Sequence, residues 1–214
     1  MNKLLARGPH GRLPAEMIRD GALFASQLLV EKRGGPPVKP YQPAGLWKEK
    51  GTATFQRDVG EGSHRRSLYT YWKRTSPPPA MLTLDAAKRD ICAVKRQATA
   101  TPLQALVLLN DPQYVEAARA LAGHAMTQAE ASTGEQLAFM FRTLTSRVAS
   151  EQESRLLQAA YDEQYDYFLA QPESAQQLLA IGDAPAEENL DPAKLAALSM
   201  VAETVMNFEE AVTK

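Results

Sequence analysis

Apolar residues recur along residues 13–32 at roughly the spacing of one helical face. The stripe is formed by Leu13, Met17, Ala22, Leu23, Leu28 and Leu29. Pro14 suits the first helical position because its missing N–H would have no partner there. The run GGPP at residues 34–37 cannot continue a helix, so the pattern predicts one helix over 13–32.

From residue 101 the pattern predicts a succession of helices. Thr101, Pro102 and Gln104 form a start signal of the capping-box kind, and an almost uniformly apolar stretch follows to residue 109. A helix that is apolar all round is typical of a buried core, so this one is expected at the centre. Further helices are expected near 112–126, 134–146, 151–170, 173–181 and 192–208.

The region from 34 to 100 has a different character. Prolines fall at positions 36, 37, 40, 43 and 77–79, and glycines at 45, 51, 60 and 62. Such punctuation predicts a long loop region, with short strands around 66–71. Long loops inside compact domains are often functional. The chain thus divides into an N-terminal helix (1–33), a loop-rich segment (34–100) and a helical bundle (101–214), within one structural domain.

Composition adds an uneven charge distribution. Residues 1–100 contain 18 Lys and Arg against 8 Asp and Glu, whereas residues 101–214 contain 6 against 17. Two interpretations stay open: the basic half binds a polyanion or an acidic partner, or the two halves attract each other internally. No stretch reaches the roughly 18 apolar residues of a membrane span, and the first residues contain too short an apolar run for a secretory signal.

A basic and aromatic decapeptide at 65–74 is the most distinctive local signal. Its candidate ligand-binding residues are Arg65, Arg66, Tyr69, Tyr71, Trp72, Lys73 and Arg74. Arginine binds phosphate, sulfate or carboxylate through paired hydrogen bonds, and aromatic faces stack on sugars or bases. The alternative is a structural knot, in which the arginines tie the loop to carboxylates of the helical half.

Other chemistry is weakly indicated. Three histidines lie far apart in sequence, so no metal site is expected. The lone cysteine, Cys92, is expected to be a small buried side chain. The carboxylates Asp162, Glu163 and Asp166 are expected on a solvated helix face. No nucleophile elbow, phosphate-binding loop or dinucleotide fingerprint is present, so the catalytic residues are unknown.

Three phrases carry a family resemblance. They are KPYQPAGLW at 39–47, RRSLYTYWKRT at 65–75 and TPLQALVLLNDP at 101–112. In this order they resemble the C-terminal domain of unknown function of large, secreted planctomycete-type proteins that often also carry a cytochrome-c-like domain. The resemblance extends from about Arg12 through Arg119 and more loosely to the end.

The resemblance implies an exported or periplasmic location, although no signal peptide is visible in this chain. It also implies that the chain is an N-terminally truncated copy, that haem belongs to a separate domain, and that this chain itself holds no cofactor. Because no activity is established for such proteins, the resemblance assigns no catalytic residue.

Together these observations predict a mainly α fold, a helical bundle with the Pro- and Gly-rich loop wrapped over it. The first functional hypothesis is a non-catalytic structural or interaction module whose partners are the other domains of a larger exported protein. The alternative is a module that binds carbohydrate, such as a polysaccharide, or another polyanion, nucleic acid not being the expected ligand. A hydrolase of uncharacterised type is the weakest hypothesis.

Overall fold

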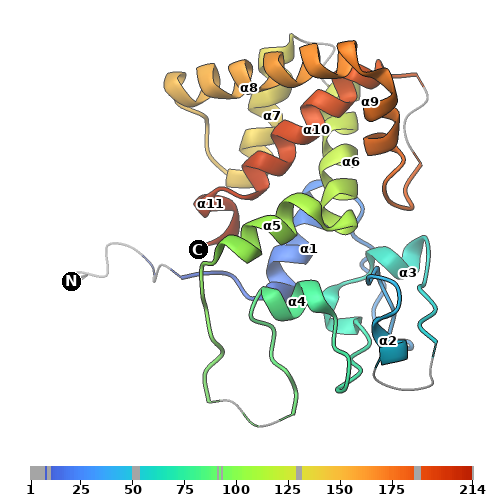
Figure 1. Ribbon diagram of the computed structural model, residues 1–214. Helices are drawn as coiled ribbons and strands as arrows, with labels where there is room; N and C mark the ends of the chain where they lie inside the picture. Colours follow the sequence, from blue (N-terminus) through green and yellow to red (C-terminus); the bar gives the residue numbers. More distant parts are fainter. Residues whose placement is uncertain are drawn as a thin grey trace.

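Helices dominate the computed structural model, which describes residues 8, 11–49, 54–90, 92, 94–128, 132–185 and 189–213. The predicted mainly α fold is confirmed: these residues form eleven α-helices and one short 3-10 helix, and their only β pairing consists of three isolated bridges. The loop-rich region is not wrapped over the bundle as expected: in Figure 1 the helical bundle lies at one end of the molecule and the loop-rich region at the other.

The bundle is built around one helix, α10 (Pro192–Met206). It packs against α6 (Pro112–Gln128), α7 (Thr133–Thr145), α8 (Glu151–Ala170) and α9 (Pro172–Leu179). Its small residues Ala196, Ala197 and Ala202 are fully buried, which lets neighbouring helices approach closely on several sides. These five helices lie within a few residues of their predicted bounds.

Side-chain caps explain where several helices begin. Ser132 with Glu135, and Ser150 with Glu153, each form a complete capping box before α7 and α8. The Asp191 carboxylate accepts hydrogen bonds from two backbone N–H groups at the start of α10. Because the first N–H groups of a helix have no partner inside it, these acceptors fix the start points.

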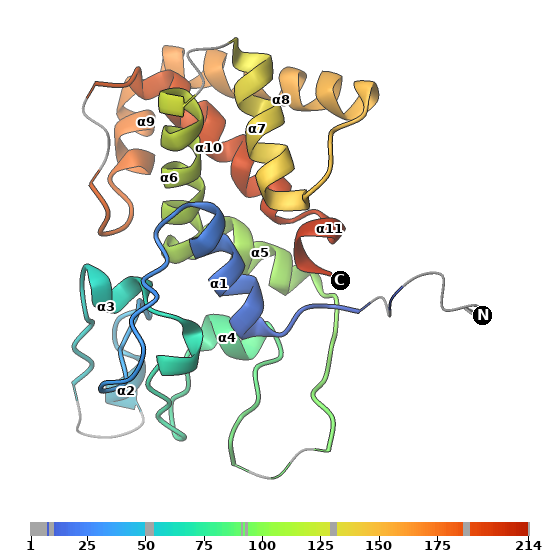
Figure 2. The ribbon, with the colours of Figure 1, turned by 180° about the vertical axis from the view of Figure 1, so that it is seen from behind.

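The first helix is shorter than predicted. α1 spans Ala15–Ala25 and ends because Gln27 adopts a left-handed conformation with φ of +58°. The amide of Leu28 then donates to the carbonyl of Leu23 at 2.9 Å, a backbone pattern that closes helices. α1 lies between the bundle and the loop-rich region, packing on α6, α7 and the short α4 (Pro79–Thr83) (Figure 2).

The loop-rich region contains only short elements. They are α2 (Leu46–Glu49), α3 (Glu61–His64) and the 3-10 helix η1 (Ser67–Tyr69). The strand expected at 66–71 is therefore wrong. A 3-10 turn occupies its middle, and the flanking residues make only the single bridges Val30 to Arg65 and Val38 to Thr70.

The helix α5 (Pro102–Asn110) forms as predicted, with the Thr101 hydroxyl accepting from the Gln104 amide, but it does not lie at the centre of the core. Only Gln104 and Leu108 are buried, whereas Leu103 and Leu106 are 59% and 54% exposed. The helix is apolar all round but only partly covered, so these two leucines lie on the surface. The short α11 (Glu209–Val212) follows α10 and ends the described chain near Leu13.

Candidate functional site

The structure places Arg65 inside the loop-rich region rather than on its surface. The buried Arg65 guanidinium donates to the carbonyl oxygens of Lys32, Gly34 and Pro36. It also lies over the Tyr69 ring, 4.0 Å from the centroid. The Tyr69 hydroxyl accepts from the Gly34 amide at 2.8 Å. Arg65 and Tyr69 therefore hold the turn at 32–36 in place.

Tyr71 and Lys73 belong to a second, separate group. The Tyr71 ring lies 5.8 Å from the buried ring of Trp47, which meets Phe55 edge-on at 5.2 Å. The Lys73 ammonium lies 4.3 Å from the centre of the Trp47 ring, a cation–π contact. These side chains form a small satellite core beneath the loop.

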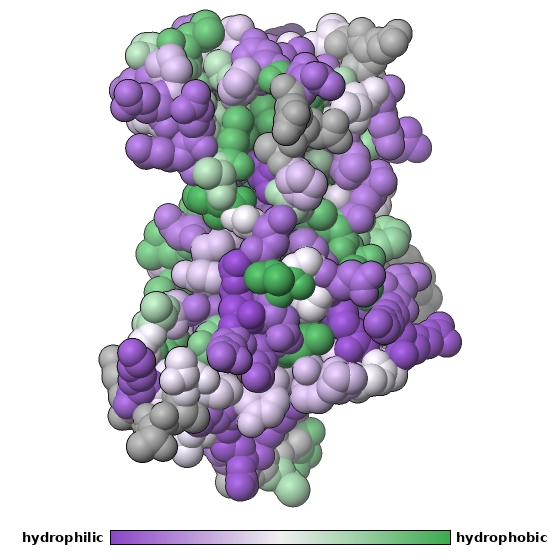
Figure 3. Space-filling model, turned by 90° about the vertical axis from the view of Figure 1, so that its right-hand side faces the viewer, coloured by the Kyte–Doolittle hydropathy of each residue, from purple (hydrophilic) through white to green (hydrophobic). Residues whose placement is uncertain are grey.

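The remaining candidates lie apart from both groups. The Trp72 indole N–H donates to the Lys88 carbonyl at 2.9 Å, and Arg89 lies over its ring. Arg66 and Arg74 are exposed, and neither forms an ion pair with any residue in the described ranges. The seven residues are thus spread over several places. Figure 3 shows mainly hydrophilic side chains on the side where α3 and α9 lie.

A residue that sequence reasoning missed, Arg19 of α1, anchors the loop-rich region. Its side chain is only 3% exposed. The guanidinium donates to the carbonyl oxygens of Ser63 (2.5 Å) and Arg65 (2.9 Å). It also donates to Ser67 Oγ and to Gln113 Oε1 at 3.1 and 2.7 Å. Burial lowers its pKa, an effect that Tyr114 and nearby carboxylates oppose. One arginine therefore joins α1, the loop and α6.

A second missed group, the clasp, joins the loop to the helical half through Glu116 of α6. Glu116 Oε2 lies 3.1 Å from His64 Nε2, without the alignment of a good hydrogen bond. Glu116 Oε1 accepts from the backbone amides of Asp183 (2.7 Å) and Ala184 (2.5 Å). Burial by itself would raise the Glu116 pKa. The His64 contact and these amides outweigh it, so the pKa lies below its ordinary value.

Gly182 makes the clasp sterically feasible. A Cβ at this position would lie 2.6 Å from Cγ and Cδ of Glu116, and its φ is +101°. Only glycine combines this close approach with that backbone conformation. The following Asp183 carboxylate pairs with Arg57 and lies 2.7 Å from Ser63 Oγ. The signal that could have revealed the anchor and the clasp is a charged residue interrupting an apolar helix face, as Arg19 and Glu116 both do.

The clasp also places the hydroxyl of Ser63 beside the Asp183 carboxylate. Ser63 Oγ lies within hydrogen-bond distance of two acceptors, the Asp58 carbonyl (2.8 Å) and Asp183 Oδ2. A nucleophile needs a base to take its proton, and among the described residues no imidazole contacts this hydroxyl. The described residues also contain no group of three His, Cys, Asp or Glu side chains that could hold a metal ion.

The other sequence candidates are on the surface. Cys92 is exposed, so the expectation that it is buried is wrong: it lies in the long segment between α4 and α5. Asp162, Glu163 and Asp166 are exposed on α8, as expected for a solvated face. None of the helices in the described ranges is long and apolar enough to cross a membrane.

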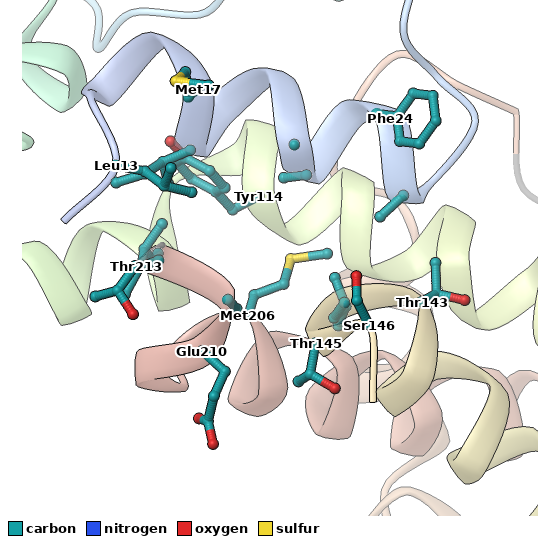
Figure 4. Close-up of a pocket in the computed structure, with 18 residues that line it drawn as sticks. Leu13, Met17, Phe24, Tyr114, Thr143, Thr145, Ser146, Met206, Glu210 and Thr213 are labelled. Carbon is teal, nitrogen blue, oxygen red and sulfur yellow. The ribbon is translucent and has the colours of Figure 1, made fainter. Parts of the chain in front are cut away.

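A concave surface lies beside α1. It is a hollow of about 550 Å³ between α1, the end of α7 and α11. Its walls are mainly apolar, with Leu13, Tyr114 and Met206 between the helices and Thr143, Thr145 and Thr213 near the rim (Figure 4). Mainly apolar walls with a few polar groups at the rim are typical of binding sites.

Comparison with known proteins assigns a family but no activity. Residues 1–161 match the model of the PSD1 family, described as a protein of unknown function (DUF1553). No curated protein and no solved structure matches the chain.

Proposed function

Because the chain belongs to the PSD1 family of proteins of unknown function (DUF1553), we propose its role from its own residues: it is a non-catalytic interaction module of a larger exported protein. Its partners are other domains of that protein. The resemblance described above supports a planctomycete-type parent with a cytochrome-c-like domain, and any haem belongs there rather than to this chain.

Uncovered apolar side chains on two helices carry this proposal. Met17 and Phe24 of α1 are 52% and 72% exposed, and Leu103 and Leu106 of α5 are more than half exposed. Single exposed apolar residues are ordinary, but several on one helix mark a surface that another polypeptide covers. The buried charged residues support the same role. Arg19, Arg65 and Glu116 all bind groups of this chain and so hold the fold together.

Site-specific cross-linking tests the proposal. The photo-reactive residue p-benzoyl-phenylalanine is placed at position 24 or 106, and at position 163 as a control, since Glu163 is an exposed polar residue of α8. After irradiation in cells of the source organism, mass spectrometry identifies the cross-linked peptides. We expect positions 24 and 106 to react with defined segments of one polypeptide. Yields no higher than those at position 163 would contradict an interaction role.

A polyanion- or carbohydrate-binding module is the second candidate, favoured by the exposed Arg66 and Arg74 and by Tyr71, which is more than one-third exposed. Both tryptophans, Trp47 and Trp72, lie in the same segment, so their fluorescence reports binding there. Neutral and sulfated polysaccharides would be titrated at low and moderate salt. A saturable shift that survives salt would indicate a sugar site, and one lost with salt would indicate general polyanion affinity.

A further inference from the structure

The outer face of α1 is flanked by two adjoining hollows that together form a groove. The larger, of about 550 Å³, reaches α11, and the smaller, of about 440 Å³, lies beside Leu29 and Phe139. Phe24, Ala25 and Thr143 line both. Phe24 therefore stands as a ridge between them, and we call this combined surface the α1 groove.

An apolar stripe runs along α1 at the mouth of the groove. Met17, Gly21 and Phe24 are all exposed and are spaced four and three residues apart, so they lie on one helix face. A Cβ at Gly21 would meet nothing within 4 Å, which leaves an open notch between the two large side chains. A ridge, a notch and a second ridge are the relief on which another helix packs.

The charge at the groove has one sign. The only charged residues lining its two hollows in the described part of the chain are Glu210 and Glu31. Glu210 shares Arg147 with Glu153, so this trio has more negative than positive charge. A complementary partner carries basic residues beside its apolar face.

We infer that the α1 groove binds an amphipathic helix of the partner polypeptide, with basic residues on both sides of its apolar face. The inference rests on the proposed interaction role and names the chemistry of the partner. Apolar side chains of that helix enter the two hollows on either side of Phe24, and its Lys or Arg residues face Glu31 and Glu210. This is helix-in-groove recognition, in which anchors three and four residues apart fill apolar pockets.

Three synthetic, fluorescein-labelled 16-residue peptides test the inference by fluorescence anisotropy. The first has a Leu and Ala face with Lys at both ends, the second replaces each Lys with Glu, and the third places Pro in the middle of the first. We expect the Lys peptide to bind the full chain at least roughly tenfold more tightly than the other two, a difference of about 1.4 kcal/mol.

Variants of the groove make the test site-specific. Met17→Ser combined with Phe24→Ser should weaken binding of the Lys peptide roughly tenfold or more, since these anchors contribute apolar contact. Leu156→Ser, on the exposed face of α8, should leave it unchanged. Because all three positions are exposed, the circular dichroism spectrum and the urea midpoint should match those of the wild type, and both are measured first.

Several outcomes would overturn the inference. Equal binding of the Lys and Glu peptides, or equal binding by the groove variant and Leu156→Ser, would exclude a basic helix in this groove. Self-association of the wild type that the groove variant abolishes would identify a second copy as the occupant. Displacement of the Lys peptide by laurate at low micromolar concentration would identify a small apolar ligand. Cross-linking at position 24 without peptide binding would refute only this inference, whereas failure of both would refute the interaction role as well.

Discussion

Replacing Arg19 with methionine should weaken the attachment of the loop-rich region to the helices. The substitution keeps a long apolar stem but removes a guanidinium that is 3% exposed and donates four hydrogen bonds. The carbonyl oxygens of Ser63 and Arg65 lose these donors. Each buried acceptor left without a partner costs about 1–3 kcal/mol, so for two acceptors we expect a loss of about 2–6 kcal/mol. That is a large share of the roughly 5–15 kcal/mol by which a domain is stable.

Urea unfolding followed by two probes measures this loss. Circular dichroism at 222 nm reports the helices, and tryptophan fluorescence reports the loop-rich region because both tryptophans, Trp47 and Trp72, lie there. In Arg19→Met both midpoints should fall, and the fluorescence midpoint should fall further. The control is Arg66→Met, which removes an exposed arginine from the same loop and should change the free energy of unfolding by less than about 0.5 kcal/mol. Equal midpoints for the two variants would refute the anchoring role of Arg19.

Three further predictions concern the clasp, the bundle and α5. Gly182→Ala places a Cβ 2.6 Å from Glu116 and should destabilise by about 2 kcal/mol. Gly134→Ala meets only Ser132 Oγ at 3.9 Å and should be neutral or slightly stabilising in urea unfolding. Burial raises the Glu203 pKa from 4.5 to about 8, so the contribution of Glu203 to stability is fully present below pH 4.5 and is lost as the pH rises to 8. Between pH 4.5 and 8 this lowers the free energy of unfolding by about 4 kcal/mol, and Glu203→Gln should remove that fall. A wild-type urea midpoint that does not change between pH 4.5 and 8 would contradict this. Leu106→Ser should change the melting temperature little, because the side chain is 54% exposed, and a fall of more than about 4 °C would show that it is packed.

The helices of the second half could be predicted because contacts between residues close in sequence set where they begin. Ser132, Ser150 and Asp191 each satisfy backbone N–H groups within three residues, so a short window of sequence contains the whole interaction. The end of α1 could not be predicted in this way. Gln27 takes a left-handed conformation that glycine or asparagine usually occupies, and the apolar stripe continues past it to Leu29.

Burial of α5 was predicted wrongly for a different reason. Periodicity shows that a helix is apolar all round, but it does not show what covers each side. Leu108 packs into the core while Leu103 and Leu106 face outward. The same pattern fits a helix that is buried within one chain and a helix whose outer side another polypeptide covers.

The decapeptide at 65–74 was interpreted either as a ligand-binding surface or as a knot tied to carboxylates of the helical half. Arg65 instead binds backbone carbonyl oxygens of residues 32–36, and Arg66 and Arg74 are exposed. The buried ties run through Arg19, His64 and Glu116. Their partners are 44 to 94 residues away in sequence, and no local pattern encodes such a pairing. The sequence did show a charged residue within an otherwise apolar helix face at Arg19 and at Glu116, but it gave no indication of the partner of either charge.

The clasp also constrains how the chain is made. Arg57 and Ser63 meet Asp183 across 126 and 120 residues. A ribosome adds about 5–20 residues per second, so synthesis of the intervening chain takes roughly 6–24 seconds. During that interval Arg57 and Ser63 have been synthesised, but their partner Asp183 has not. Residues 57–63 therefore spend their first seconds without their contact to Asp183, and this part of the loop closes only after the helices up to α9 have been synthesised.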